Sequence, residues 1–188
     1  MAVPVTLFAD FTSAASYVAE AALWRLVDEG LATVDFRALE LFPAPARLPL
    51  APPDVEEVRP LAGELGVELR RPPLSARTRK AHELARFGAA KGMERETRAA
   101  IYAAYFRDGR DVGRIDVLVE IASALGLDTT ESKVVLDIDS HTASVLADAA
   151  EARRLAVSAV PVMVVRDEAR IVAGPQPLDL LRAVLAGA

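Results

Sequence analysis

The polar turn ADFTSAAS, residues 9–16, carries the most chemically suggestive groups near the start of the chain. It contains the Asp10 carboxyl and the hydroxyls of Thr12, Ser13 and Ser16, and it lies between an apolar run and a helical pattern. Backbone amides at a helix N-terminus lack partners and favour a bound anion. A serine hydroxyl there could donate to such an anion, or it could serve only as the helix N-cap. Both interpretations are open from the sequence.

Several other chemistries find no support in the residues. The chain has no cysteine, which excludes disulfides, thiolate metal sites and thiol nucleophiles. His82 and His141 are its two histidines and lie far apart in sequence, so we expect no metal site. The sequence also has no glycine-rich phosphate loop, nucleophile elbow or Ser-His-Asp arrangement.

Length and composition restrict the class of protein. With 188 residues, 52% of them apolar, the chain can form one well-buried domain or one domain with a large insertion. A formal net charge of −5 argues against a nucleic-acid partner, because phosphate contacts need a basic face. No apolar stretch is long enough for a membrane span, and the N-terminal one is too short for a signal peptide. We therefore expect a cytoplasmic protein with no membrane partner.

Hydrophobic periodicity predicts the elements that position the turn. The apolar run at 3–8 is typical of a buried strand, and the helical pattern that follows it ends at Gly30. Residues 33–39 alternate well enough for a second strand. The chain is therefore expected to open as β-α-β, with the turn between its first strand and first helix.

A long helical block is expected to separate this opening from a second α/β part. Six of the 12 prolines lie between Pro43 and Pro60, which indicates an extended loop. Helical pattern then dominates to about residue 127, with segments near 54–65, 75–91, 93–107 and 114–125. After it we expect a helix at 140–155, strands at 160–166 and 170–173, and a helix at 177–185.

Motifs in this order resemble the DsbA family of thioredoxin-like proteins. DFTSAASY is similar to the family's D-x-x-C-P-W-C-Y turn, with Ser13 and Ser16 in the two cysteine positions. Three segments resemble the FrnE-like branch of the family: RALELFP, RTRKAHELARFGAAKG and AIYAAYFRDGRDVGRIDVLVEIASALGLD. Near the C-terminus, LAVSAVPVMVV and VAGPQPLDLL resemble the family's G-V-x-G-V-P-x-F-x-V strand and its x-x-G-A-Q-P-x-x-x-L ending.

The resemblance implies an α/β, thioredoxin-like fold with a large all-helical insertion. Residues 1–42 and 138–188 would form the thioredoxin-like domain, and residues 43–137 the insertion domain. It also implies a cis bond between Val160 and Pro161, facing the Ser13 turn across a groove. A cis bond there would present the Val160 backbone to an extended peptide or a glutathione-like ligand.

Candidate site residues follow from this groove. Ser13 is the candidate catalytic residue. The candidate binding residues are Ser16, Tyr17, His82, Tyr105, Val160 and Pro161. Simpler roles compete for three of them, since Ser16 could satisfy local backbone groups while Tyr17 and His82 could pack in the core.

Two functions are compatible with these residues. Dithiol exchange, the family activity, is excluded because a serine hydroxyl cannot form a mixed disulfide. The first hypothesis is a non-redox binding protein for a peptide or a small thiol ligand. The second is a glutathione-dependent transferase or isomerase, since kappa-class glutathione transferases and 2-hydroxychromene-2-carboxylate isomerases resemble the chain at DFTS. In those enzymes the serine at the Ser13 position donates to the sulfur of bound glutathione.

The second hypothesis would require glutathione as cofactor. The basic residues that could bind its carboxylates are Arg77, Arg79 and Lys80, in a locally basic segment. A homodimer is compatible with either hypothesis, and the sequence leaves open whether the protein is an enzyme.

Overall fold

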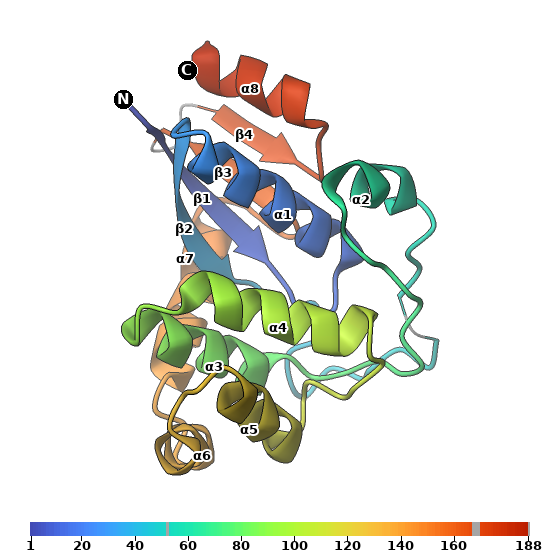
Figure 1. The fold of residues 1–188 in the computed structure, drawn as a ribbon, viewed down its shortest axis with the longest axis vertical. Helices are drawn as coiled ribbons and strands as arrows, with labels where there is room; N and C mark the ends of the chain where they lie inside the picture. The colour runs from blue at the N-terminus through green and yellow to red at the C-terminus, as the bar shows by residue number, and fades with distance from the viewer. Residues whose placement is uncertain (52, 167–169, 188) are drawn as a thin grey trace.

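The computed structural model describes residues 1–51, 53–166 and 170–187 of the chain. In these residues helices surround a four-stranded sheet, and both termini lie close to the last helix (Figure 1). Along the chain the elements are β1 (Val3–Ala9), α1 (Ala14–Asp28), β2 (Ala32–Ala38), α2 (Arg59–Leu65), α3 (Arg79–Ala90), α4 (Glu94–Phe106), α5 (Ile115–Ala124), α6 (Thr129–Asp137), α7 (Thr142–Arg154), β3 (Val162–Val165), β4 (Arg170–Ala173) and α8 (Leu178–Ala186).

The strand register determines which loops meet at the end of β1. The sheet order is β2-β1-β3-β4, with β1 parallel to β2 and antiparallel to β3. Phe8 near the end of β1 pairs with Val162 at the start of β3. The turn after β1 and the residues before β3 therefore lie at the same end of the sheet.

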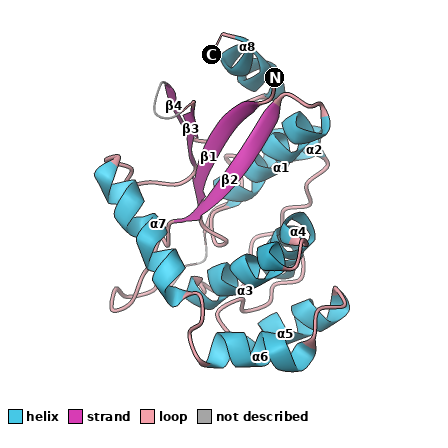
Figure 2. Cartoon of the chain, turned by 90° about the vertical axis from the view of Figure 1, so that its left-hand side faces the viewer, coloured by secondary structure: helices cyan, strands magenta, loops and turns pink. Residues whose placement is uncertain are grey.

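Different helices cover the two faces of the sheet (Figure 2). Val5 and Leu7 of β1 belong to the buried cluster that contains α1, whereas Phe8 packs with Val162 and with Ala152 of α7. This division follows from the alternation of side chains along a strand. The predicted β-α-β opening and the second α/β part are both present.

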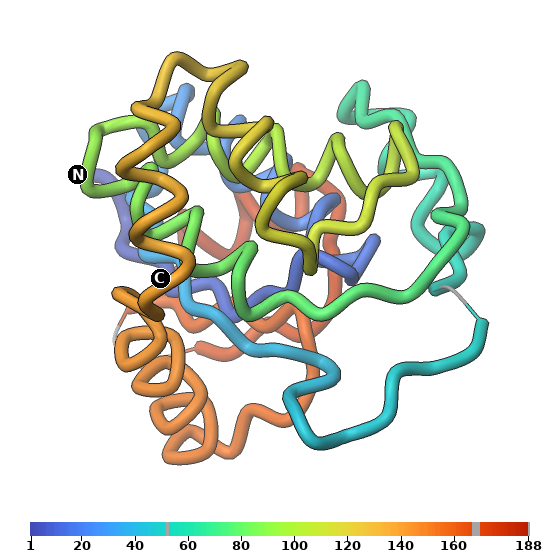
Figure 3. The backbone as a smooth tube through the Cα atoms, turned by 90° about the horizontal axis from the view of Figure 1, so that it is seen from below, coloured from blue at the N-terminus to red at the C-terminus, as the bar shows by residue number. Residues whose placement is uncertain are grey.

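Helices α3–α6 form a helical block beside the sheet (Figure 1), and Figure 3 views the molecule from the side of this block. Leu84 of α3, Ile101 of α4 and Leu118 of α5 belong to the same buried cluster as Leu7 of β1. The helical block and the sheet therefore share one core. The boundaries of a separate insertion domain at 43–137 stay a prediction.

Two helices differ from the expected pattern. The predicted segment 54–65 is helical only over Arg59–Leu65, because Pro60 is accepted in the first turn of a helix but not in its interior. Helix α6 was not predicted. It has nine residues, of which Ser132 and Leu136 are buried, so it leaves almost no apolar periodicity to detect.

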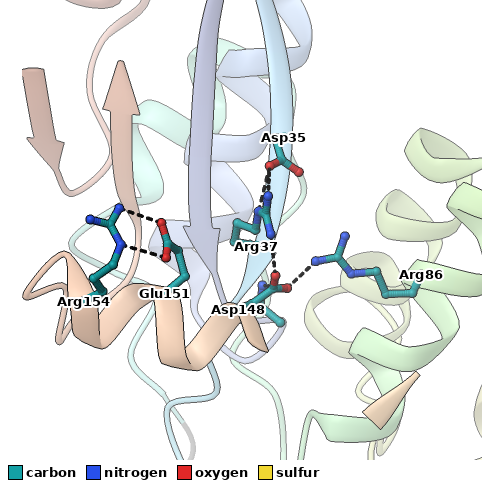
Figure 4. Close-up of polar contacts among 7 residues, drawn as sticks. Asp35, Arg37, Arg86, Asp148, Glu151 and Arg154 are labelled. Atoms are coloured by element: carbon teal, nitrogen blue, oxygen red, sulfur yellow. Dashed lines mark hydrogen bonds and ion pairs between the residues drawn. The ribbon is translucent and has the colours of Figure 1, made fainter. Parts of the chain in front are cut away.

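Asp148 of α7 forms hydrogen bonds to β2 and to α3 (Figure 4). Its buried carboxylate accepts from the backbone N–H of Ala38 at 2.9 Å and from Arg37 at 3.1 Å, both in β2. It also accepts from Arg86 of α3. This ion-pair network joins the sheet, α7 and the helical block.

Among the residues that the structure describes, no helix has the length and apolar character needed to cross a membrane.

Candidate functional site

Ser13 caps the helix that follows the first strand. Its Oγ accepts from the N–H of Ser16 at 3.1 Å, and its backbone is extended, with φ −97° and ψ 113°. The amides of Ala14 and Ala15 belong to the first turn of α1, where no carbonyl of the helix itself can accept from them. The Ser13 hydroxyl accepts one bond and keeps its own proton to donate.

Ser16 supports this turn from inside the protein. Its side chain is fully buried, and its Oγ accepts from the backbone N–H of Asp10 at 3.3 Å. The structure therefore places Ser16 behind the turn, in the simpler of the two roles considered for it.

Asp10 connects the turn to the segment that follows β2. Its fully buried carboxylate accepts from the backbone N–H of Thr12 at 3.0 Å, from the Thr12 hydroxyl at 3.2 Å, and from the N–H of Leu41. Burial raises the pKa of Asp10 to about 6, although the bonds from Leu41 and Thr12 oppose the rise. The turn therefore contains, three residues before Ser13, a buried carboxyl with a pKa of about 6.

A cavity of about 260 Å³ adjoins the turn on the side of Thr12. Its hydroxyl-bearing walls are Thr12, Ser75 and Tyr105, and its apolar walls are Leu41, Phe42, Pro49, Ala51, Pro53 and Ala76. None of these side chains carries a charge at neutral pH, so the cavity suits an uncharged, largely apolar group. We call it the Thr12 pocket.

Tyr105 is a wall of the Thr12 pocket, and its predicted place in a groove between Ser13 and Pro161 stays a prediction. Its hydroxyl donates to the carbonyl of Leu74 at 2.8 Å, which fixes the ring. Burial raises the pKa of this phenol above its usual value, and the carboxylate of Asp10 raises it further. The phenol therefore stays protonated.

Tyr17 and His82 pack among aromatic side chains and do not line the Thr12 pocket. The Tyr17 ring is stacked on Tyr102 at 4.6 Å between centroids. The His82 ring lies 4.8 Å from Phe11 and is 3% exposed. Burial lowers the pKa of His82 well below 6.5, with Arg98 adding to the effect, so the imidazole is neutral.

Val160 and Pro161 lie at the same end of the sheet as the Ser13 turn. The peptide bond between them is cis. The carbonyl of Pro161 accepts from the N–H of Gly174 at 2.9 Å, and the Pro161 side chain is buried. Neither residue is a wall of the Thr12 pocket.

The three basic residues considered for glutathione already have partners in the protein. Arg77 donates to the carbonyls of Phe42 and Ala46, both at 2.6 Å. Arg79 pairs with Glu40 at 2.5 Å, and Lys80 pairs with Glu83 at 3.1 Å. Of the three, Arg77 contacts a wall of the Thr12 pocket, because it holds the carbonyl of Phe42.

Sequence reasoning missed most walls of the Thr12 pocket. Leu41, Phe42, Pro49 and Pro53 lie in the segment after β2 and in the proline-rich loop, where no periodicity indicates which side chains turn inward. The one available signal was the bulk of Leu41 and Phe42 directly after a predicted strand.

Replacing Ser13 by alanine should lower the free energy of unfolding by about 1 kcal/mol, because the N–H of Ser16 loses its acceptor. Urea unfolding of Ser13→Ala and wild type measures the loss. Ser13→Thr, which keeps an acceptor oxygen, serves as the control and should retain most of the stability. Equal stability of wild type and Ser13→Ala would contradict the capping role.

Comparisons with known proteins agree with this architecture. The family model described as "DSBA-like thioredoxin domain" matches residues 4–186. The uncharacterized protein YwbO of Bacillus subtilis is 25% identical over 150 residues, which is 75% of each chain. A structure of a probable DsbA oxidoreductase from Streptomyces coelicolor is 25% identical and covers 98% of this chain and 89% of its own, with a TM-score of 0.84.

A 2-hydroxychromene-2-carboxylate isomerase has the same fold. Its structure matches with a TM-score of 0.79 over 98% of this chain and 95% of its own, at 17% identity. At this identity the likeness concerns the fold alone. The thioredoxin-like fold with a helical insertion, expected from the sequence, is confirmed by these matches.

Proposed function

Because the chain belongs to the family of DSBA-like thioredoxin domains but has no cysteine, we propose that it is a non-redox binding protein. Its ligand is a small thiol compound or a short peptide, held beside the N-terminus of α1. The Thr12 pocket carries this proposal, because it is an uncharged cavity of about 260 Å³ and one of its walls, Thr12, directly precedes Ser13, the N-cap of α1.

The two parts of this site favour different parts of one ligand. The amides of Ala14 and Ala15 and the Ser13 hydroxyl are donors, so they favour a carboxylate or a thiolate. The Thr12 pocket favours an apolar group attached to it. No thiol of the protein takes part, so binding leaves the oxidation state of the ligand unchanged.

A glutathione-dependent transferase or isomerase is the second candidate function. The observation that favours it is the Ser13 hydroxyl, which keeps a proton to donate and lies at a helix N-terminus, where a thiolate is stabilised. The capping role of the same Oγ weighs against catalysis, because it already accepts from the N–H of Ser16 and the residue is 8% exposed. Binding without chemistry is therefore the preferred function.

Thermal unfolding with added ligand tests the proposal. We expect reduced glutathione, S-benzylglutathione or an unrelated tetrapeptide to raise the melting temperature in a saturable manner. A ligand at a hundredfold excess over its Kd stabilises the native state by about 2.7 kcal/mol. Ser75→Trp, which fills the Thr12 pocket from its half-exposed rim, should abolish the shift.

Ala99→Trp is the matched control, since it adds the same bulk to a separate groove beside α4 and should keep the shift. A shift that survives Ser75→Trp, or no shift with any probe at millimolar concentration, would refute the proposal. A shift with glutathione that Ser13→Ala removes, together with turnover of an aromatic electrophile, would favour the second candidate instead.

A further inference from the structure

Two walls of the Thr12 pocket are held by one buried carboxylate. Thr12 follows β1 and Leu41 follows β2, and both line the cavity. Asp10 binds Thr12 through Oδ1, at 3.0 Å to its N–H and 3.2 Å to its hydroxyl, and binds the N–H of Leu41 through Oδ2. Each oxygen of the carboxylate therefore positions a different wall.

We propose that Asp10 is a positioning residue whose ionised carboxylate gives the Thr12 pocket its ligand-binding shape. The inference rests on the proposed function, since it concerns the affinity of that same site. Protonation converts one carboxylate oxygen into a hydroxyl, which is a donor and a much weaker acceptor, so the bond from Leu41 or from Thr12 to that oxygen weakens. A partly buried N–H with a weakened acceptor loses stabilisation, so its segment shifts toward water.

The surroundings of Leu41 allow such a shift. Leu41 is 39% exposed, and the carbonyl of the next residue, Phe42, is held by Arg77 at 2.6 Å. Residue 41 can therefore move while Arg77 keeps the rest of the segment in place. Thr12 is 3% exposed and belongs to the turn before α1, so it has less freedom to follow.

The ionisable groups around Asp10 keep one protonation state near pH 6, so Asp10 is the group that titrates there. From the residue before α3 comes the Thr78 hydroxyl, which hydrogen-bonds the Asp10 carboxylate, and His82 of α3 packs against Phe11, the residue after Asp10. From α4 come Tyr102, whose hydroxyl lies 3.5 Å from the Asp10 carbonyl, and Tyr105. Burial keeps His82 neutral by lowering its pKa, and keeps both phenols protonated by raising theirs.

The change in the shape of the Thr12 pocket is expected near pH 6, because burial raises the pKa of Asp10 from 3.8 to about 6. Folded Asp10 thus holds its proton more tightly than unfolded Asp10. Its contribution to the free energy of unfolding is fully present below the unfolded pKa and decreases as pH rises toward 6. Ligand affinity should change in the opposite direction and rise with pH. Stability and ligand affinity therefore change with pH in opposite directions. A purely structural role of Asp10 would not make the affinity rise while the stability falls.

Two readouts test the inference. In the ligand-free protein, the NMR chemical shift of the Leu41 amide should titrate with a midpoint near pH 6. The Kd of S-benzylglutathione, which has no free thiol, should rise about tenfold from about pH 7 to about pH 5, because the binding-competent fraction decreases by that factor. In Asp10→Asn the Leu41 amide should not titrate, and binding should be weak at both pH values.

Asp128→Asn is the matched control, since Asp128 also accepts a backbone N–H, that of Glu131 at 2.7 Å, but at the distant start of α6. It should keep the wild-type pH profile. If Asp10→Asn does not fold, the two wild-type pH titrations decide the question alone. A Leu41 amide that is unchanged from about pH 5 to about pH 7, or an equal Kd at both, would overturn the inference and leave the proposed function intact. A Leu41 amide that titrates while no probe binds would overturn the proposed function.

Discussion

Replacing Glu20 by glutamine should destabilise the protein by about 3–5 kcal/mol, because it leaves the buried guanidinium of Arg98 without a counter-charge. Glu20 and Arg98 are 3% and 4% exposed and are joined by two hydrogen bonds of 2.8 and 2.7 Å. An arginine side chain cannot lose its proton in a protein, so its charge stays buried. Equilibrium unfolding in urea measures the effect.

The position of this pair explains why its loss should be large. Glu20 lies on α1 and Arg98 on α4, so the pair joins α1 to the helical block. The Arg98 guanidinium also lies 4.3 Å from the centroid of the Phe36 ring and 5.1 Å from that of Phe11. Phe11 belongs to the turn before Ser13, so the pair supports the candidate site from behind.

The same two helices offer a matched control. Asp28 of α1 and Arg95 of α4 also form two hydrogen bonds, of 2.6 and 2.9 Å, but their side chains are 51% and 45% exposed. Asp28→Asn should therefore cost far less stability than Glu20→Gln. Replacing Glu20 by leucine together with Arg98 by methionine should recover much of the loss. Equal costs for the buried and the exposed pair would contradict this explanation.

Replacing Ser13 and Ser16 together by cysteine should create a reducible disulfide and measurable thiol–disulfide exchange in a protein that has neither. The Oγ of Ser13 lies 3.1 Å from the backbone nitrogen of Ser16, so a sulfur at residue 13 would lie against the first helical turn. Helix N-termini lower the pKa of a thiol and increase its reactivity. Residue 13 is 8% exposed and residue 16 fully buried, so the first sulfur is the more accessible to a substrate.

Mass spectrometry after alkylation, with and without reductant, detects the disulfide, and insulin reduction detects the exchange. Ser13→Cys alone is the control, since it can form a mixed disulfide but cannot resolve it. A double variant that stays reduced under air, or that oxidises without any exchange activity, would mean that the turn lacks the expected geometry.

The sequence predicted the elements that show strong periodicity and left out those that do not. Helix α1 was predicted because its apolar face, its N-cap and Gly30 all agree, and Gly30 has the positive φ of +71° that favours glycine after a helix. Helix α6 was missed because Leu136 is its one buried apolar residue. Its N-cap, Asp128, was visible in the sequence but carries little information alone.

The site was less predictable because its parts meet through long-range contacts. Ser13 and its cap are local and were predicted. Arg98 and Glu20 are separated by 78 positions in sequence, and nothing in either helix indicates that they pair. Leu41 becomes a pocket wall only because Asp10, from another segment, accepts its N–H. His82 was expected at the groove, but it lies in the buried face of α3.

The most direct test of the binding site is an NMR titration of isotope-labelled protein with S-benzylglutathione at saturating concentration. The account predicts that the largest amide shift changes occur at Ala14 and Ala15, beside the Ser13 cap, and at Leu41 and Phe42 in the Thr12 pocket. Changes centred on Ala99 and Ala103 of α4, or no saturable change at any amide, would contradict it.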